Sequence, residues 1–365
     1  MIRLTVCFAI LIVLGLIPFP AVETTATNTR SRPAPTRDSS VRRDTLRSCS
    51  RELIRLGLRC VRPGLTAAVL ALDEDASAPA PKPEFKIPDD VELIKDVAYS
   101  LDGHKSHKLD ILRLKNRPKD PMPVIVWIHG GGFRGGSKTS GYPRLMRFVQ
   151  RGYLGVSIDY RFSTEAIFPA QLEDCKCGIR FLRAKAKEYN LDADHIGVWG
   201  GSAGGNLVAM LGTTGGVKEF EGTGGWRKYS SRVQAVVEYF GMTDFLAIEE
   251  LVKQGKATAR FMLHDGKDSA SGLLGGPFWE NPELCRKASP TTYASKDDAP
   301  FYIFHGDKDP LTPASQGQLL NERLRNAGVE SDFYLVKDGK HGWPPRPDVD
   351  KRVDDFFDRH LKGKK

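Results

Sequence analysis

A glycine-rich segment with a serine at its centre is the clearest place in this sequence for covalent chemistry. Gly200-Gly201-Ser202-Ala203-Gly204 follows an apolar run that ends at Trp199 and precedes a helix-like run. In a G-x-S-x-G motif the serine occupies a sharp turn between strand and helix, and glycines leave room for the strained backbone. The hydroxyl of Ser202 is then held above the sheet as a nucleophile. The backbone N–H of Ala203 and the positive end of the following helix point to where negative charge develops.

A base and an acid that could activate this serine follow later in the chain. His305-Gly306-Asp307-Lys308-Asp309 ends one strand-like run, and Lys340-His341-Gly342 follows the next. A serine is a poor nucleophile until a base accepts its proton, and a carboxylate must hold that base in one tautomer. We therefore interpret His341 as the base and Asp309 as the acid, in the chain order Ser, Asp, His.

Asp307 is the alternative acid. It could merely cap the loop, and we favour Asp309 because it lies further past the end of the strand, where the chain turns toward the pocket. His305, at the end of that strand, is interpreted as a structural histidine rather than a second base.

A second glycine run can supply further hydrogen-bond donors. His129-Gly130-Gly131-Gly132-Phe133 directly follows the strand-like residues 124–128. Glycines expose backbone N–H groups with no side chain in the way, which an oxyanion hole requires. We expect Gly131, Gly132 and Ala203 to provide these donors. A phosphate-binding loop is the alternative, but the Lys-Ser/Thr that should follow its last glycine is missing.

From residue 90 onward, strand-like and helix-like runs alternate in the order needed to position these motifs. Val124-Ile125-Val126-Trp127-Ile128 is wholly apolar, as in strands buried on both faces of a parallel sheet. The alternation predicts a doubly wound α/β fold, with an antiparallel start because no helix separates the first two strands. We expect strands at 91–99, 109–114, 124–129, 155–160, 196–200, 233–240, 301–305 and 331–336, and helices at 143–151, 170–189, 203–212, 314–327 and 348–361.

Residues 241–293 interrupt this alternation with a segment of weak periodicity. An insertion of that size after a central strand is more often functional than idle, so we expect a small lid or a wall of the pocket. It is too short for a second domain.

The N-terminus predicts a secretory signal peptide over residues 1–22. A basic start precedes an almost wholly apolar run, residues 4–17, and Pro18-Phe19-Pro20 ends it. The run is too short to cross a bilayer of about 30 Å comfortably. We therefore expect a secreted or periplasmic protein without a stable membrane span, and membrane anchoring is the lesser alternative.

Residues 23–88 predict an Arg- and Pro-rich leader or linker, followed by a catalytic domain over residues 89–365. The alternating prolines of residues 78–83 do not pack as a helix. Whether this leader stays in the mature protein, and whether its Cys49 and Cys60 form a disulfide, are questions that the residues leave open.

Composition argues against a nucleic-acid partner. The net charge is +9, but residues 1–81 hold eleven Arg, no Lys and seven acidic residues, which gives +4. The remaining +5 is spread over the body rather than gathered in a stripe beside aromatic residues. No cysteine pair or histidine cluster completes a zinc site, so we expect neither a metal nor a cofactor.

The motifs together resemble the α/β-hydrolase family, specifically small bacterial esterases with an HGGG-type oxyanion loop. This branch includes hormone-sensitive-lipase-like and feruloyl- and acetyl-xylan-esterase-like enzymes. The likeness covers about residues 90–362 and rests on HGGGF, Tyr160-Arg161, Phe168-Pro169-Ala170-Gln171, GGSAGG, Phe240-Gly241-Met242-Thr243-Asp244, Ala288-Ser289-Pro290, HGDKDPLTP and KHG. It implies an α/β-hydrolase fold with a mostly parallel eight-stranded sheet, helices on both faces and a small lid. It also implies that Asp309 is the acid and that the chemistry needs no metal or cofactor.

The sequence therefore predicts a serine carboxylesterase acting on short-chain or polysaccharide-linked acyl esters. Amide hydrolysis by the same triad, as in a formamidase or a peptidase, is the enzymatic alternative. A hydrolase-fold binding protein without catalysis is a second alternative, but such proteins usually lack a triad member. The residues do not indicate the oligomeric state.

Overall fold

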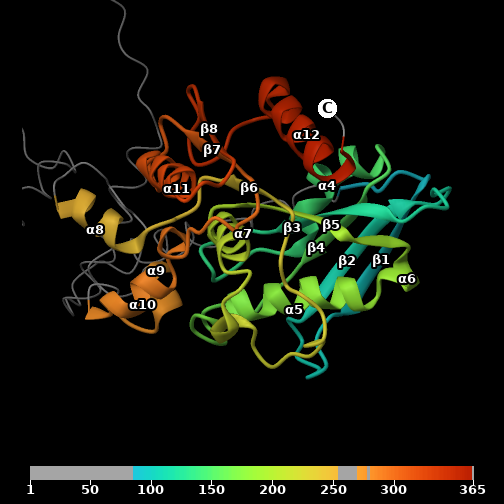
Figure 1. Cartoon of the computed structure of the whole chain (residues 1–365), viewed down its shortest axis with the longest axis horizontal. Coiled ribbons are helices and arrows are strands. Elements are labelled where there is room, and N and C mark those ends of the chain that lie inside the picture. Colours follow the sequence, from blue (N-terminus) through green and yellow to red (C-terminus); the bar gives the residue numbers. More distant parts are fainter. Residues whose placement is uncertain (1–84, 254–268, 278–279, 364–365) are drawn as a thin grey trace, which may run out of the picture. The chain divides into compact units, whose positions relative to one another are not determined.

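Eight strands form one sheet, and each corresponds to one of the predicted runs (Figure 1). The computed structural model describes residues 85–253, 269–277 and 280–363. The predicted signal peptide and nearly all of the predicted leader, with Cys49 and Cys60, lie outside these ranges. The strands are β1 (Val91–Ala98), β2 (Lys108–Leu114), β3 (Met122–Ile128), β4 (Leu154–Ile158), β5 (Leu191–Gly201), β6 (Ala235–Tyr239), β7 (Phe301–Gly306) and β8 (Ser331–Val336).

The strand order across the sheet is β1-β2-β4-β3-β5-β6-β7-β8. β2 pairs antiparallel with both β1 and β4, and every other neighbouring pair is parallel. The predicted mostly parallel sheet with an antiparallel start is therefore confirmed. β3 and β5 lie at its centre, and Val124, Val126 and Ile128 of β3 are fully buried.

Helices cover both faces of the sheet, as predicted. α4 (Tyr142–Val149) and α12 (Pro347–Lys362) pack on one face, and α5 (Ala170–Ala184), α7 (Ala203–Thr213) and α11 (Ser315–Asn326) contribute to the apolar cluster on the other. Figure 1 shows α4 and α12 above the sheet and α5 below it. The helix expected over 170–189 is divided in two, because Lys185 leaves helical geometry before α6 (Ala186–Tyr189) begins.

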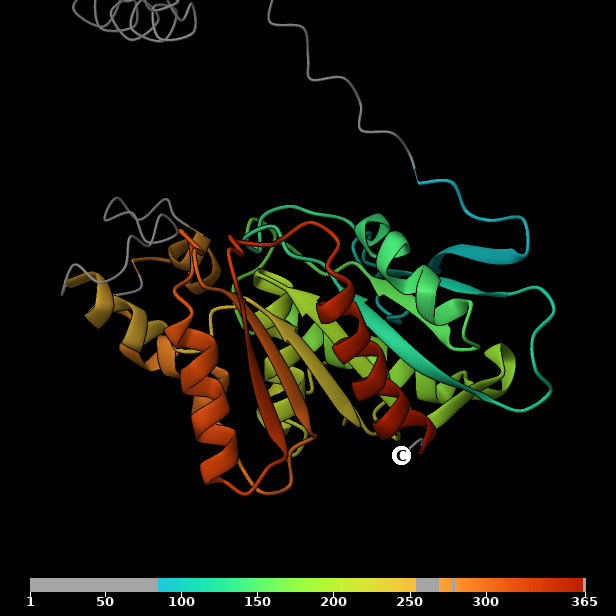
Figure 2. The ribbon, with the colours of Figure 1, turned by 90° about the horizontal axis from the view of Figure 1, so that it is seen from above.

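α4 and α12 lie side by side (Figure 2), joined by an apolar contact and a row of ion pairs. The rings of Phe148 and Phe357 meet edge to face at 5.6 Å. At the rim, Arg147 pairs with Asp354 at 3.0 Å between Nε and Oδ1. Phe148 and Phe357 are buried, whereas the ion pairs remain partly open to solvent, which screens their charges.

The described part of residues 241–293 includes α8 (Phe245–Lys253), α9 (Ser269–Leu274) and α10 (Pro282–Lys287). Among the described residues, no helix is both long enough and apolar enough to span a bilayer.

Parallel strands present their carboxyl ends along one edge of the sheet, where ligands bind in open α/β sheets. The chain that leaves β3, β5, β7 and β8 at this edge carries the glycine run, Ser202, Asp309 and His341 respectively.

Candidate active site

Ser202 occupies the tight turn from β5 into α7 with a strained backbone. Its φ of 59° and ψ of −123° are rare for a residue with a side chain. The flanking glycines make this turn possible: a Cβ at Gly200 would lie 2.4 Å from the oxygen of Gly204, and one at Gly204 would lie 2.1 Å from the oxygen of Ile128. The backbone N–H of Ser202 donates to Tyr239 of β6 at 2.9 Å, which fixes the turn to the sheet. Strain of this kind is tolerated where the surroundings over-determine the conformation.

The imidazole of His341 lies between Ser202 and Asp309. Its Nδ1 is 2.8 Å from Oδ2 of Asp309, and its Nε2 is 2.8 Å from Oγ of Ser202. An ionised carboxylate can only accept, so the proton of the neutral ring is on Nδ1. The lone pair on Nε2 then accepts from the serine hydroxyl, which is the arrangement that a general base needs.

Asp309 is fully buried and held by the backbone of its own loop. Its Oδ1 accepts from the N–H groups of Leu311 at 2.8 Å and Thr312 at 3.0 Å. Burial alone would raise the pKa of Asp309, but hydrogen bonds from His305 and His341 outweigh burial and hold it well below its usual value. Asp307, the alternative acid, is exposed to solvent. The structure thus brings Asp309, not Asp307, to the histidine.

The glycine run after β3 folds into a loop beside Ser202. Gly131 and Gly132 have φ values of 118° and 61°, and a Cβ at Gly131 would lie 2.2 Å from the oxygen of Gly135. No backbone carbonyl of the described residues accepts from the N–H groups of Gly131, Gly132 or Ala203. Such donors, fixed in place and not already bonded to the backbone, are suited to an oxyanion. Gly132 and Ala203 line the pocket with Ser202, whereas Gly131 is not among the lining residues.

His129 anchors this loop instead of taking part in the chemistry. Its ring stacks on Tyr160 with centroids 4.5 Å apart, and the hydroxyl of Tyr160 donates to the carbonyl of His129 at 2.9 Å. The Nδ1 of His129 lies 2.8 Å from the carbonyl oxygen of Gly130. The contacts of the His129 ring and of the His129 carbonyl oxygen therefore fix the conformation of the loop without a substrate.

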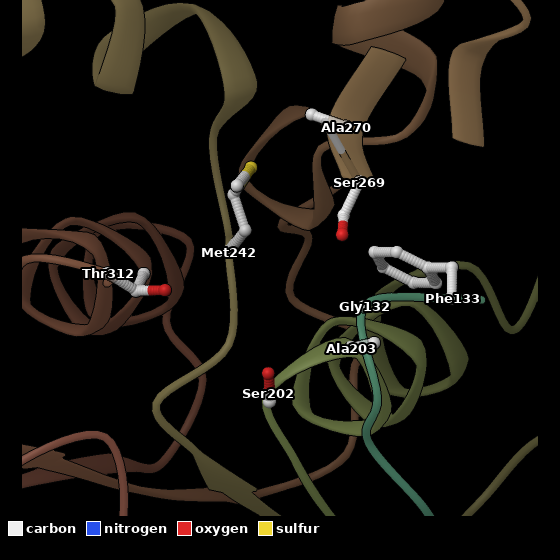
Figure 3. Close-up of a pocket in the computed structure, with 8 residues that line it drawn as sticks. All are labelled: Gly132, Phe133, Ser202, Ala203, Met242, Ser269, Ala270 and Thr312. Carbon is white, nitrogen blue, oxygen red and sulfur yellow. The ribbon is translucent and has the colours of Figure 1, made fainter. Parts of the chain in front are cut away.

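A narrow pocket opens over Ser202 (Figure 3). The space open at its centre amounts to about 20 Å³, little more than a water molecule needs. Figure 3 shows the side-chain oxygens of Ser202, Thr312 and Ser269 and the side chain of Met242 around the pocket. The pocket is lined by Gly132, Phe133, Ser202, Ala203, Met242, Ser269, Ala270 and Thr312.

Sequence reasoning did not single out four of these lining residues. Thr312 and Met242 lie within two of the motifs that carry the family resemblance, and that position could have indicated them. No motif marks Ser269 and Ala270, which belong to the 241–293 segment. Phe133, at the end of the glycine run, lines the pocket. Trp226 donates its indole N–H to the carbonyl of Tyr99 at 2.8 Å.

Within the described ranges, no group of His, Cys, Asp and Glu side chains has an arrangement that could hold a metal ion. Cys175, Cys177 and Cys285 are buried thiols. Burial raises the pKa of the Cys177 thiol to about 11, so this residue is a packing group and not a nucleophile.

Comparison with solved structures finds carbohydrate esterases. A bifunctional GH43-CE protein of Bacteroides eggerthii is 33% identical with a TM-score of 0.67, over 76% of this chain and 36% of that one. A truncated carbohydrate esterase from gut microbiota is 31% identical with a TM-score of 0.65, over 74% of this chain and 96% of that one.

Comparison by sequence gives the same picture. Esterase LipQ of Mycobacterium tuberculosis is 29% identical over 248 residues, which are 67% of this chain and 56% of LipQ. The chain spans a little over half the length of three curated relatives that it matches. The BD-FAE family profile matches residues 109–324, the stretch that runs from β2 through α11 and carries the glycine run, Ser202 and Asp309. The predicted α/β-hydrolase resemblance is thus confirmed, and the chain belongs to the BD-FAE family.

Proposed function

We propose that this protein is a serine carboxylesterase that cleaves small acyl groups from carbohydrate or other alcohols. The observation that carries the proposal is the unbroken chain of hydrogen bonds from Asp309 through His341 to Ser202. The names of the similar proteins, esterase LipQ and a carbohydrate esterase, support the ester as the substrate. A hydrolase-fold binding protein would have no need for this arrangement.

The reaction proceeds by acyl transfer through a covalent intermediate. His341 takes the proton of Ser202 as the hydroxyl attacks the ester carbonyl, and Asp309 stabilises the imidazolium that forms. The N–H groups of Gly131, Gly132 and Ala203 bind the developing oxyanion, and each such donor contributes on the order of 10²–10³ in rate. Protonated His341 then gives its proton to the leaving alcohol. Water repeats both steps and releases the acid.

The first test is hydrolysis of p-nitrophenyl acetate by the purified protein and its Ser202→Ala variant. We expect the substitution to lower kcat on the order of 10⁶-fold, as loss of a triad nucleophile does elsewhere. Ser295→Ala is the matched control, because this exposed serine only hydrogen-bonds Asp298. Near-normal turnover by folded Ser202→Ala, or no ester turnover by the folded parent, would refute the proposal, and amide cleavage in the second case would favour the amidase alternative.

The size of the pocket indicates which acyl group fits. The side chains of Met242, Ala270 and Phe133 bound the narrow pocket over Ser202 and favour a short acyl group such as acetyl over longer chains. Met242→Ala removes one wall and admits two further methylenes, each worth about 0.8 kcal/mol when buried. We expect the ratio of kcat/KM for p-nitrophenyl butyrate over acetate to rise roughly tenfold. Met146→Ala, on α4 and packed against the other face of the sheet, should leave that ratio unchanged.

We propose further that the protein is exported, on the basis of the signal-like residues 1–22. Mass spectrometry of the N-terminus of the protein recovered from its native cells tests this. A mature chain that begins after the apolar run supports export, and an intact Met1 in the cytoplasmic fraction contradicts it.

A further inference from the structure

The glycine run after β3 is the first part of a loop that returns to the end of β4. Ile128 of β3 is in register with Ile158 of β4, so His129 and Asp159 lie at the ends of neighbouring parallel strands. Five of the ten residues from His129 to Lys138 are glycines. Glycine gives a backbone little conformational preference of its own. The oxyanion donors of this loop therefore need contacts that fix their positions.

The chain that leaves β3 and the chain that returns to β4 pack directly against each other. A Cβ at Gly131 would lie 2.2 Å from the oxygen of Gly135, and one at Gly136 would lie 2.3 Å from the oxygen of Gly130. The leaving chain carries two of the three proposed oxyanion donors, and no side chain separates it from the returning chain. A shift of the returning chain therefore displaces those donors.

The returning limb, residues 135–138, is fixed to the sheet through Lys138. The N–H of Lys138 donates to Oδ1 of Asp159 at 2.7 Å, and its Nζ lies 3.3 Å from Oδ2 of the same carboxylate. The carbonyl oxygen of Lys138 accepts from the hydroxyl of Ser157 on β4 at 2.6 Å. At the start of the loop, Nε2 of His129 lies 3.5 Å from Oδ1 of Asp159. One carboxylate thus faces both ends of the loop.

Two further carboxylates surround the ammonium of Lys138, whose side chain is mostly buried. Nζ lies 2.9 Å from Asp96 of β1 and 3.7 Å from Asp110 of β2. Burial lowers the pKa of Lys138, but the three carboxylates outweigh burial and raise it above its ordinary value. Burial raises the pKa of Asp159, but its contacts with His129 and Lys138 outweigh burial and lower it. Both groups are therefore charged at neutral pH, and three strands contribute to holding the returning limb.

We propose that Lys138 and Asp159 are positioning residues for the oxyanion hole. Neither side chain lines the pocket. They act by holding the returning limb against the chain that carries the N–H groups of Gly131 and Gly132. The oxyanion forms only in the transition state, so a displaced donor slows acyl transfer without weakening the binding of the ester. This inference rests on the proposed function, because ester turnover is one of its readouts.

The test is a double-mutant cycle on this ion pair, with kcat and KM measured on p-nitrophenyl acetate. Lys138→Met removes the charge and keeps most of the length of the side chain. We expect it to lower kcat about tenfold to a hundredfold, with KM within twofold. Asp159→Asn keeps an oxygen that can accept from the N–H of Lys138 and should lower kcat less. Because both residues act through one contact, the double variant should lose no more kcat than Lys138→Met alone.

The matched control is the exposed ion pair of Lys351 and Asp355 on α12, with Nζ 2.6 Å from Oδ2. The same exchanges, Lys351→Met and Asp355→Asn, remove an equal charge far from the glycine run. These single variants and their double variant should keep kcat and KM within about twofold of the parent, because an exposed pair contributes little.

Inhibition by trifluoroacetone separates positioning from stability. This ketone adds to the hydroxyl of Ser202 and forms a tetrahedral oxyanion, so its Ki depends on the same donors as the transition state. We expect Ki to rise in Lys138→Met by about the factor by which kcat/KM falls, and to stay unchanged in Lys351→Met. Partial unfolding would lower the number of active sites but would not change the Ki of the sites that remain.

The outcomes distinguish this inference from the proposed function. Unchanged kcat and Ki in both folded single variants, or losses of kcat that add in the double variant, would overturn the positioning role, even if stability fell. If Lys138→Met does not fold, Asp159→Asn decides by kcat and Ki in the same way. Failure of the esterase proposal would appear instead as a folded parent protein without ester turnover.

Discussion

Among the histidines that contact carboxylates, His107 and His341 have surroundings that give them opposite properties. His107, beside β2, has Nδ1 2.8 Å from Asp102 and Nε2 3.0 Å from Asp174. His341 has one carboxylate, Asp309, and its second nitrogen faces the hydroxyl of Ser202. Carboxylates at both ring nitrogens favour the cationic form of His107. The Nε2 of His341 faces a hydroxyl instead, from which it can take a proton.

The comparison shows that an imidazole–carboxylate contact is not by itself a catalytic feature. Burial lowers the pKa of His107, but the hydrogen bonds and charges of Asp174 and Asp102 outweigh burial and raise it. The resulting cation ties the loop between β1 and β2 to α5, where Asp174 lies. What distinguishes His341 is the strained turn that brings a serine to its second nitrogen.

The largest effect expected from this comparison follows from exchanging one carboxylate in each pair for an amide. Asp309→Asn can donate to Nδ1 of His341 and so favour the wrong tautomer, which we expect to lower kcat on the order of 10⁴-fold. Asp102→Asn, at the partly exposed partner of His107, should leave kcat within a few-fold. Steady-state kinetics on p-nitrophenyl acetate measure both. Equal losses of kcat in the two variants would mean that the two histidines do not differ as described.

Removal of the His107 ring should affect stability and not turnover. His107→Leu leaves the buried carboxylate of Asp174 without one of its cationic partners, and loss of a partner from a buried pair costs about 3–5 kcal/mol. Arg161 still pairs with Asp174 at 2.7 Å, so we expect the lower end of that range. Urea unfolding gives the free energy, and kcat of the folded variant should match the parent. His195→Leu, at an exposed pair, is the control that should cost much less.

The smallest expected effect is the pH dependence of the difference in free energy of unfolding between the parent and His107→Leu. The pKa of His107 in the folded protein lies above its ordinary value of 6.5. The contribution of the charged His107 to the free energy of unfolding is therefore complete below pH 6.5. It is lost as pH rises through the pKa of His107 in the folded protein. Urea unfolding of the parent and His107→Leu from pH 6 upward should show the difference between them shrinking. A difference that grows over this interval would contradict a cationic His107.

The fold could be predicted from sequence because the central strands are apolar without interruption. The prediction was least accurate at β5, expected from Ile196 but observed from Leu191. Asp192 and Asp194 break the apolar run, yet Leu191 pairs with Met122 of β3 and extends the strand. Pairing with a neighbour thus decides a strand end that periodicity cannot locate.

The candidate site also contains residues that the sequence could predict and residues that it could not. Ser202, Asp309 and His341 could be predicted because each belongs to a local motif, and the structure brings all three together. A pocket wall was expected from residues 241–293, but its members Met242, Ser269 and Ala270 could not be named, because only tertiary packing carries these side chains to the serine. His305 was expected to be structural, and its Nε2 contacts the carbonyl oxygen of Thr312 at 2.8 Å, beside Asp309.

The strained turn at Ser202 also has a practical consequence in crude extracts. A hydroxyl polarised by an imidazole and presented above a sheet is the group that fluorophosphonate reagents phosphonylate. A fluorescent reagent of this class would tag the protein in unfractionated cells and culture medium. The apparent mass of the labelled band would report how the chain is processed, and the fraction that contains it would report where the protein resides. Neither readout requires knowledge of the natural ester.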